Sequence, residues 1–423
     1  MNENASPVNS AQKLTPAFAL VQAPFWATYC VSVSFAAVYL QYLGYNNRQL
    51  GLIMAAGCLM SSLLGPLLSS RIDRTPELTA SKLAPFVLAA QALTLLLLIL
   101  SPHKGPLSAL GFLLYLTFSN SVNSLNLKLY SDAVYGGADI DYGFCRGIGS
   151  LGYVVVSVAL GFAVKLTSAL LIPWAGLALT AAQYLTFRRF HKAAPESRAV
   201  RERERGATLM EFARNNRSFC LLLLGTVLMF IAHSAAGNFM INVVRNLGGD
   251  EGSMGWLNGF MAAVEIPMMF LYSRIFRKRG AAAAALTLSF VFFTLKSAGI
   301  AAAATIPQLA AVFLLQAPSF ALYTAAIVPY VTETVAYEDS AKAQSLAYTM
   351  TTVGSVLASL IAGPLYDALS VSATLWICCA LCAAGTVIAL LAMRRSQDVS
   401  RETDQLPPAG YRFGPDILKQ TRP

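Results

Sequence analysis

The chain has 423 residues, of which 56% are hydrophobic and only 12% are charged. Soluble globular proteins carry about a quarter of their residues as charged side chains, so this composition excludes an ordinary soluble protein. The net charge of +10 could suggest a nucleic-acid partner, but the basic residues flank long apolar stretches, as they do in membrane proteins. We therefore expect a protein of the lipid bilayer with no nucleic-acid partner.

Apolar stretches long enough to cross a bilayer recur along the chain. One helical crossing takes roughly 20 residues, and about twelve such stretches are present. The run 95–100 lacks the alternation of polar and apolar residues that a membrane β-barrel strand requires, which favours an all-α membrane fold. The helices are predicted at 16–40, 48–70, 83–101, 106–130, 141–166, 168–187, 218–244, 252–273, 281–303, 306–332, 341–368 and 371–393.

Basic residues gather in alternate loops between these helices. An excess of Lys and Arg marks the cytoplasmic loops of a membrane protein. If the N-terminus is cytoplasmic, the outer loops receive little beyond Arg48, Lys104 and Arg245. We expect a multi-pass protein of the plasma (cell inner) membrane with both termini cytoplasmic and no cleaved signal peptide. The inner basic residues are then Arg71, Arg74, Lys82, those within 188–217 and 274–279, Arg394 and Arg395.

A hydrophilic segment at 188–217 divides the predicted helices into six and six. The two halves share a pattern, because Leu50-Gly51 and Met254-Gly255 open corresponding helices. Two parallel six-helix repeats are the plan of the major facilitator fold, whose substrate site lies between the halves. The predicted organisation is a cytoplasmic tail 1–15, an N-terminal half 16–187, a cytoplasmic loop 188–217, a C-terminal half 218–393 and a cytoplasmic tail 394–423.

Several segments resemble known permeases of that superfamily. The segment DYGFCRGIGS, residues 141–150, looks like the fifth-helix signature of the 3-phenylpropionate permease and lactose permease families. Residues 65–82 resemble the superfamily's loop between its second and third helices, with Asp73 and Arg74 as its acid and base. Glu265-Ile266-Pro267 and residues 343–367 are also similar to that group. The resemblance implies a transporter that couples a small-molecule substrate to protons, and we expect a monomer.

Two basic residues are candidates for the substrate site of the N-terminal half. Lys128 lies late in the predicted fourth helix and Arg146 early in the fifth, where they could reach similar depth. An arginine can hold a carboxylate with two parallel hydrogen bonds, whereas both side chains could instead extend to water. Related permeases place an acid near the position of Lys128. Two bases without that acid favour an anionic substrate over a neutral sugar.

Two charged residues are predicted deep in the C-terminal half. Glu265 lies midway along the eighth helix and Lys296 midway along the ninth, and charges at that depth normally face a cavity and pair. We expect them to serve proton coupling, with a permanent structural ion pair as the alternative. Lactose permease has a carboxylate in its tenth helix, where this chain has Gln316-Ala317-Pro318-Ser319. Glu265 is therefore the main carboxylate candidate.

Four further polar residues of the C-terminal half are candidates for binding substrate. His233 and Asn238 lie in the seventh helix, and Gln316 and Tyr323 share one face of the tenth. Each could line the cavity. Each could equally satisfy a hydrogen bond between helices.

Motifs of other protein classes are absent or lack their structural setting. Residues 147–152 match the dinucleotide pattern, but they lie inside an apolar helix rather than between a strand and a helix. The sequence has no Walker phosphate loop, no HExxH zinc motif and no GxSxG nucleophile motif. We expect no enzyme activity, no cofactor and no metal.

The sequence favours a secondary transporter that moves an organic acid or a related polar solute by alternating access, and we expect it to be a proton symporter. One alternative is an efflux carrier of the same fold for sugars or drugs. Another is a membrane sensor or scaffold whose segment 188–217 and tail bind a partner. Nothing in the sequence decides the direction of transport.

Overall fold

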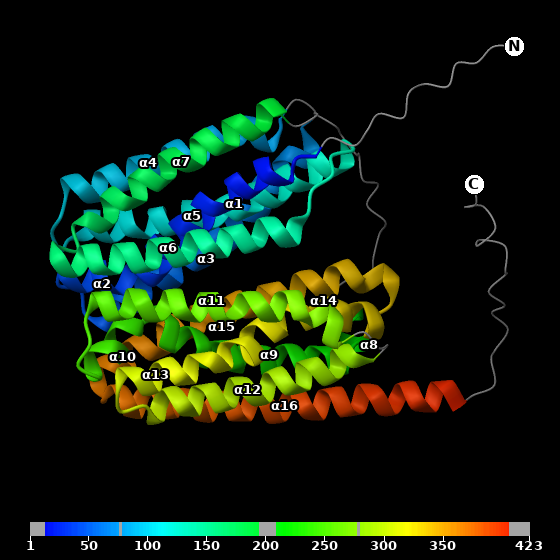
Figure 1. Ribbon diagram of the computed structural model, residues 1–423. Helices are drawn as coiled ribbons and strands as arrows, with labels where there is room; N and C mark the ends of the chain where they lie inside the picture. The colour runs from blue at the N-terminus through cyan, green and yellow to red at the C-terminus, as the bar shows by residue number, and fades with distance from the viewer. Residues whose placement is uncertain (1–12, 76–77, 194–208, 277–279, 406–423) are drawn as a thin grey trace, which may run out of the picture.

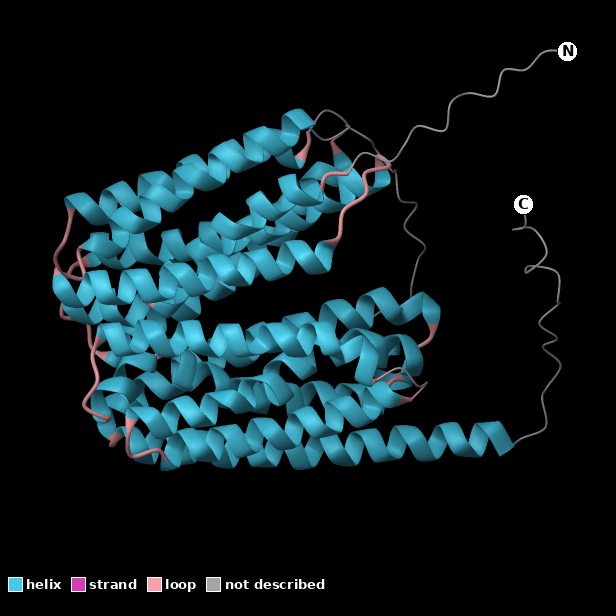
Figure 2. Ribbon diagram, in the orientation of Figure 1, coloured by secondary structure: helices cyan, strands magenta, loops and turns pink. Residues whose placement is uncertain are grey.

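The computed structural model describes residues 13–75, 78–193, 209–276 and 280–405. Most of the predicted N-terminal tail, half of the segment 188–217 and the last part of the C-terminal tail lie outside these ranges. Within them, every named element is a helix, and the extended backbone is limited to one bridge between Lys13 and Asp139. Figure 2 shows this helical architecture.

The first six predicted crossings correspond to helices α1 to α7. The first crossing is interrupted by a π-helical turn, Cys30–Ser34, which begins six residues after Pro24. Side chains that accept a backbone N–H mark several helix starts: Asn46 forms a capping box with Gln49, and Asp141 caps the following helix. The helices are α1 Thr15–Tyr29, α2 Ala36–Tyr42, α3 Asn47–Arg74, α4 Ala80–Leu100, α5 Pro106–Tyr135, α6 Tyr142–Leu166 and α7 Leu171–Ala193.

The second six crossings follow the short helix α8, Leu209–Asn215. The tenth crossing is irregular, because a 3-10 turn, Leu314–Gln316, and a π-helical turn, Ala317–Ala321, separate its two α-helical parts. Pro318 contributes to this break, since it cannot donate a backbone hydrogen bond. The helices are α9 Arg217–Asn238, α10 Met240–Asn246, α11 Glu251–Ile275, α12 Ala281–Ala302, α13 Ile306–Phe313, α14 Leu322–Thr334, α15 Tyr337–Ala368 and α16 Val371–Gln405.

The predicted all-α membrane fold is confirmed. Nine of the helical spans in the described part of the chain are long and apolar enough to cross a membrane by composition alone. The crossings formed by α5, α7 and α11 are not among the nine. Two of them carry charged side chains within the span, Lys128 and Asp132 on α5 and Glu265 on α11, and such charges normally face a polar interior.

The helices form two bundles that lie side by side (Figure 1). Helix α6 packs along α11, and α3 packs along α15, so these two pairs join the bundles. Glycines permit this close approach: a Cβ atom at Gly255 would lie 2.8 Å from the Cα of Gly161, and one at Gly51 would press on the backbone of Ser359. The two glycines of the repeated pattern, Gly51 and Gly255, therefore both lie where the bundles meet.

The bundles are closest at the end that holds α2 and α10, and they diverge toward the end that holds α8 (Figure 1). Polar contacts close the first end. The Asp367 carboxylate accepts hydrogen bonds from the backbone N–H groups of Asn47 and Arg48, at 3.0 and 2.8 Å. Asn242 donates to Asn47 at 2.8 Å. The Lys165 ammonium lies 2.9 Å from the Asp250 carboxylate.

Candidate functional site

Arg146 lies in the first turns of α6, at the boundary with α1. Its guanidinium stacks on the Trp26 ring, 3.6 Å from the ring centroid, and donates to the Ser150 hydroxyl at 2.7 Å. The Trp26 indole N–H donates to Gln22 at 3.1 Å, which fixes the ring beneath the guanidinium. Because these contacts leave other N–H groups of Arg146 unused, it could still grip a carboxylate.

The glycines of α6 have a packing role. A side chain at Gly149 would collide with the Trp26 ring, and one at Gly152 would lie 2.6 Å from the carbonyl oxygen of Ala23. The dinucleotide-like pattern at 147–152 thus serves the packing of α1 against α6. The same packing positions Trp26 under Arg146.

Glu265 lies on α11, the helix of the other bundle that packs along α6. Its charge and that of Arg146 attract each other, and Lys296 attracts Glu265 as well. The Tyr29 ring packs on the Trp26 ring, with centroids 5.4 Å apart. A base of one bundle and an acid of the other therefore influence each other electrostatically across the junction of α6 and α11.

A chain of hydrogen bonds connects four side chains of the C-terminal bundle. Gln316 donates to Glu265 at 2.8 Å, and Lys296 donates to the Gln316 side-chain oxygen at 2.7 Å. The Lys296 ammonium also lies 3.2 Å from His233 Nδ1. Lys296 and Gln316 are only 2% and 1% exposed, so neither can reach bulk water by extending its side chain.

Glu265 and Lys296 were expected to form a direct pair, and the structure places the Gln316 amide between them. Gln316 reaches this position from the irregular tenth crossing, at the end of its 3-10 turn. An amide both accepts from the lysine and donates to the carboxylate. The Gln316 amide can therefore couple a change in the protonation of Glu265 to Lys296, although the two charged groups are not in direct contact.

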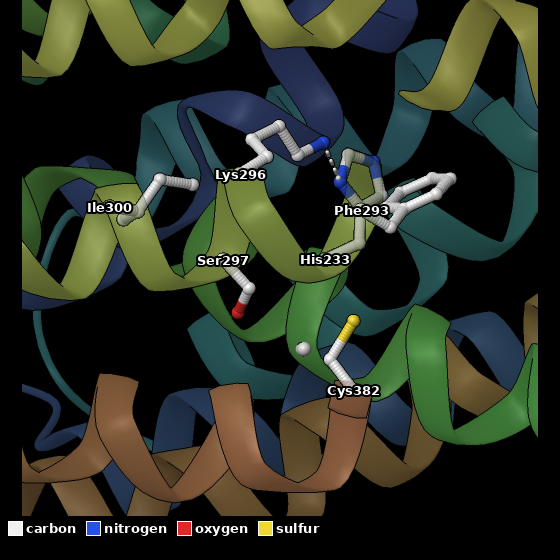
Figure 3. Close-up of a pocket in the computed structure, with 7 residues that line it drawn as sticks. His233, Phe293, Lys296, Ser297, Ile300 and Cys382 are labelled. Atoms are coloured by element: carbon white, nitrogen blue, oxygen red, sulfur yellow. Dashed lines mark hydrogen bonds between the residues drawn. The ribbon is translucent and has the colours of Figure 1, made fainter. Parts of the chain in front are cut away.

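A small cavity lies next to this chain (Figure 3). Its volume is about 10 Å³, which is room for about one water molecule. The Lys296 side chain points along it toward His233, and Ser297 and Cys382 lie on its other side. The cavity is too small for an organic substrate.

Lys128 is not the unopposed base that the sequence suggested. Its ammonium lies 3.0 Å from the Asp132 carboxylate, one turn later on α5. Asp132 therefore opposes the charge of Lys128, although it is not the acid that related permeases are expected to pair with the fifth-helix arginine. Arg146 is left as the stronger candidate for holding an anion, and the spacing of four residues between Lys128 and Asp132 was the signal that could have revealed the pair.

The remaining candidates of the C-terminal bundle contact other side chains of the same bundle. Besides contacting Lys296, His233 stacks on Phe320 with centroids 5.1 Å apart. Asn238 donates to the Ser359 hydroxyl at 3.0 Å, and Tyr323 donates to the Thr226 hydroxyl at 3.4 Å. Asn238 and Tyr323 are both buried, and they join helices within this bundle.

The conformational loop motif lies at the end of α3, away from these side chains. Arg74 is the last residue of α3 and is exposed. Asp73 belongs to the same turn, and its side chain lies outside the described part of the structure. The structure adds Trp26 and Ser150 to the candidate site. The spacing of four residues between Arg146 and Ser150 could have indicated that Ser150 is a partner of Arg146. The sequence gives no sign that Trp26 stacks on Arg146.

Comparisons with known proteins agree with this architecture. A family model described as the MFS_1 like family matches residues 24–378, most of the chain. No curated protein sequence matches the chain.

Three solved structures with a similar fold are those of transporters. The nucleoside transporter NupG superposes with a TM-score of 0.70 at 15% identity, covering 89% of this chain and 96% of its own. An auto-inhibited peptide transporter of the POT family gives 0.68 at 11% identity, covering 94% and 98%. A bacterial homologue of the human lysosomal transporter Spinster, in an inward-facing and unoccupied conformation, gives 0.59 at 13% identity, covering 93% and 98%. Identities this low establish a shared fold alone.

Proposed function

The chain belongs to the MFS_1 like family and is a membrane transporter of the major facilitator type; from this premise we propose that it carries a small organic anion together with protons. The two bundles would rock about the central site to expose it to one side of the membrane at a time.

The relation between Arg146 and Glu265 carries this proposal. They lie on α6 and α11, the paired helices of opposite bundles, and their charges attract each other. The negative charge of Glu265 would repel a substrate carboxylate bound at Arg146. Protonation of Glu265 removes that repulsion, because it neutralises the carboxylate. Binding of a proton and binding of an anion would therefore favour each other, as symport requires.

The hydrogen-bonded chain of the C-terminal bundle supports a proton role for Glu265. Gln316 holds the carboxylate on one side and Lys296 on the other. If Glu265 becomes neutral, Lys296 loses an attractive charge and can strengthen its contact with His233. His233, Gln316 and Lys296 would thus adjust to the proton rather than bind the substrate directly.

The aromatic surroundings of Arg146 favour a substrate with an apolar or flat body. Trp26 lies against the guanidinium, and the Tyr29 ring packs on Trp26 with centroids 5.4 Å apart. Rings of this kind pack well on planar organic groups. An aromatic or similarly flat organic acid matches both features, and this agrees with the resemblance of 141–150 to the 3-phenylpropionate permease family.

The test is transport by the purified protein in liposomes that contain a pH-sensitive dye. Aromatic acids, nucleosides, short peptides and sugars are added outside in turn, and proton entry is recorded. The proposal predicts proton entry with organic acids and none with neutral sugars. Proton entry with sugars or nucleosides alone would contradict the anionic substrate class, and substrate uptake without proton entry would contradict symport.

A further inference from the structure

A second cavity lies in the N-terminal bundle between α4 and α7. It has a volume of about 350 Å³. The two helices pack together on the side of this bundle that faces away from the other bundle (Figure 1). Ser81, in the first turn of α4, and His191, near the end of α7, place it at the end of the bundle where α7 leads into the central segment. It is therefore distinct from the site at Arg146 and Glu265.

The walls of this cavity divide into an apolar part and a polar part. Leu88 and Phe187 are buried and, with Pro85, form the apolar part. The polar side chains lie nearer the helix ends, and those of Tyr184 and Arg188 are exposed. This division matches a ligand with a polar head and an apolar body. The polar lining consists of Ser81, Tyr184, Arg188 and His191.

Positive charge dominates the polar part. The seven described residues that line the cavity include no acid, and no hydrogen bond or ion pair joins the Arg188 side chain to another described residue. A guanidinium binds a phosphate through two parallel hydrogen bonds. Ser81 adds a hydroxyl in the first turn of α4, where the helix dipole also favours an anion. The head group that fits is therefore an anionic phosphate.

The position of the cavity identifies the source of that phosphate. Tyrosine and arginine at the ends of membrane helices lie at the level of the lipid head groups, and anionic lipids attract basic residues on the cytoplasmic side, the side predicted for this end of the chain. We propose that the cavity binds the phosphate of an anionic phospholipid, with the start of an acyl chain against Leu88 and Phe187. A volume of about 350 Å³ suits the head group and first carbons of a lipid rather than the whole molecule.

The experiment titrates phosphatidylglycerol into the full-length protein in detergent micelles and counts bound lipid by native mass spectrometry, with phosphatidylcholine as the zwitterionic reference. Arg188→Gln is expected to weaken phosphatidylglycerol binding by about tenfold or more, as loss of charge-assisted hydrogen bonds does. Arg189→Gln is the matched control, because Arg189 is exposed on the next position of α7 and does not line the cavity. It should bind as the unmodified protein does.

A second variant separates the cavity from general charge attraction. Ser81→Trp keeps Arg188 and His191 and fills the space between α4 and α7. It should therefore abolish the preference for phosphatidylglycerol over phosphatidylcholine. Retained binding in both Arg188→Gln and Ser81→Trp would overturn the proposal, and so would equal losses in Arg188→Gln and Arg189→Gln. Displacement of the lipid by an equal concentration of glycerol phosphate would also overturn it, because the ligand would then be a soluble phosphate.

Discussion

The Asp367 carboxylate, at the end of α15, accepts hydrogen bonds from the backbone of Asn47, at the start of α3. A side chain of one bundle thereby holds the helix start of the other. The N–H groups in the first turn of a helix have no partner within the helix, so a carboxylate there satisfies donors and complements the positive end of the helix dipole. The contact stabilises the conformation in which this end of the protein is closed.

Asp367→Asn should favour opening at this end, because an amide presents one acceptor where the carboxylate presents two. A loss of about 1 kcal/mol would raise the open population about fivefold. The reporter is Ser157→Cys, at a buried position whose hydroxyl contacts the Gly255 carbonyl of the other bundle at 2.8 Å. Its maleimide labelling rate should rise about fivefold, in proportion to the open population.

The matched control is Asp339→Asn, an acid of the same helix that pairs with Lys342 near its other end. That variant should leave labelling at position 157 unchanged. An equal rise in both variants would show that the effect is general destabilisation. No rise in Asp367→Asn would show that the contact does not keep this end closed.

Arg146→Lys should weaken substrate binding by about tenfold or more, because lysine keeps the charge and loses the planar group that makes paired hydrogen bonds. It should also lose the stack on Trp26 and the hydrogen bond to Ser150. Substrate-dependent thermal stabilisation of the purified protein measures the change. Arg74→Lys, at an exposed position, is the control, and unchanged affinity in Arg146→Lys would remove Arg146 from the binding site.

The pair of Lys165 and Asp250 should contribute to closure equally at every pH between about 5 and 8. The hydrogen bond from Lys165 and the backbone N–H of Ser253 lower the pKa of Asp250 to about 2. An acid with a lowered pKa contributes fully above its ordinary pKa and loses the contribution as the pH falls through the lowered one. Being partly exposed, with side chains 47% and 37% accessible, the pair is worth about 1 kcal/mol at most.

Labelling of Ser157→Cys against pH tests this expectation. The curves with and without Asp250→Asn should run parallel from pH 5 to 8, the variant being labelled faster throughout. Curves that converge within this range would show that Asp250 titrates there. Any pH dependence that both curves share then belongs to another group.

The helices of this fold follow from local sequence signals. The starts of α3 and α6 are visible as Asn46 and Asp141, which accept backbone N–H groups three residues later. The glycines at 51 and 255, which repeat in the two halves, mark the joins between bundles. Helix α16 extends to Gln405, past the predicted end at 393, because no proline or glycine stops it at the membrane boundary.

The candidate site could be predicted only in part. Charges deep in apolar helices revealed Arg146, Glu265 and Lys296 as groups that need partners. Which partners they find depends on contacts between distant segments, such as Trp26 under Arg146 and Gln316 between the other two. The break at 314–321 that directs Gln316 inward is a tertiary feature, since Pro318 signals a distortion but not its direction.

Glu265→Gln tests the central claim most directly. The amide keeps the size of the side chain and can still bind Gln316, but it cannot exchange a proton. In liposomes that contain a pH-sensitive dye, the variant should show no substrate-driven proton entry while exchange of substrate across the membrane by counterflow continues. Loss of both activities in a variant that folds normally, or proton entry equal to that of the unmodified protein, would contradict a proton-coupling role for Glu265.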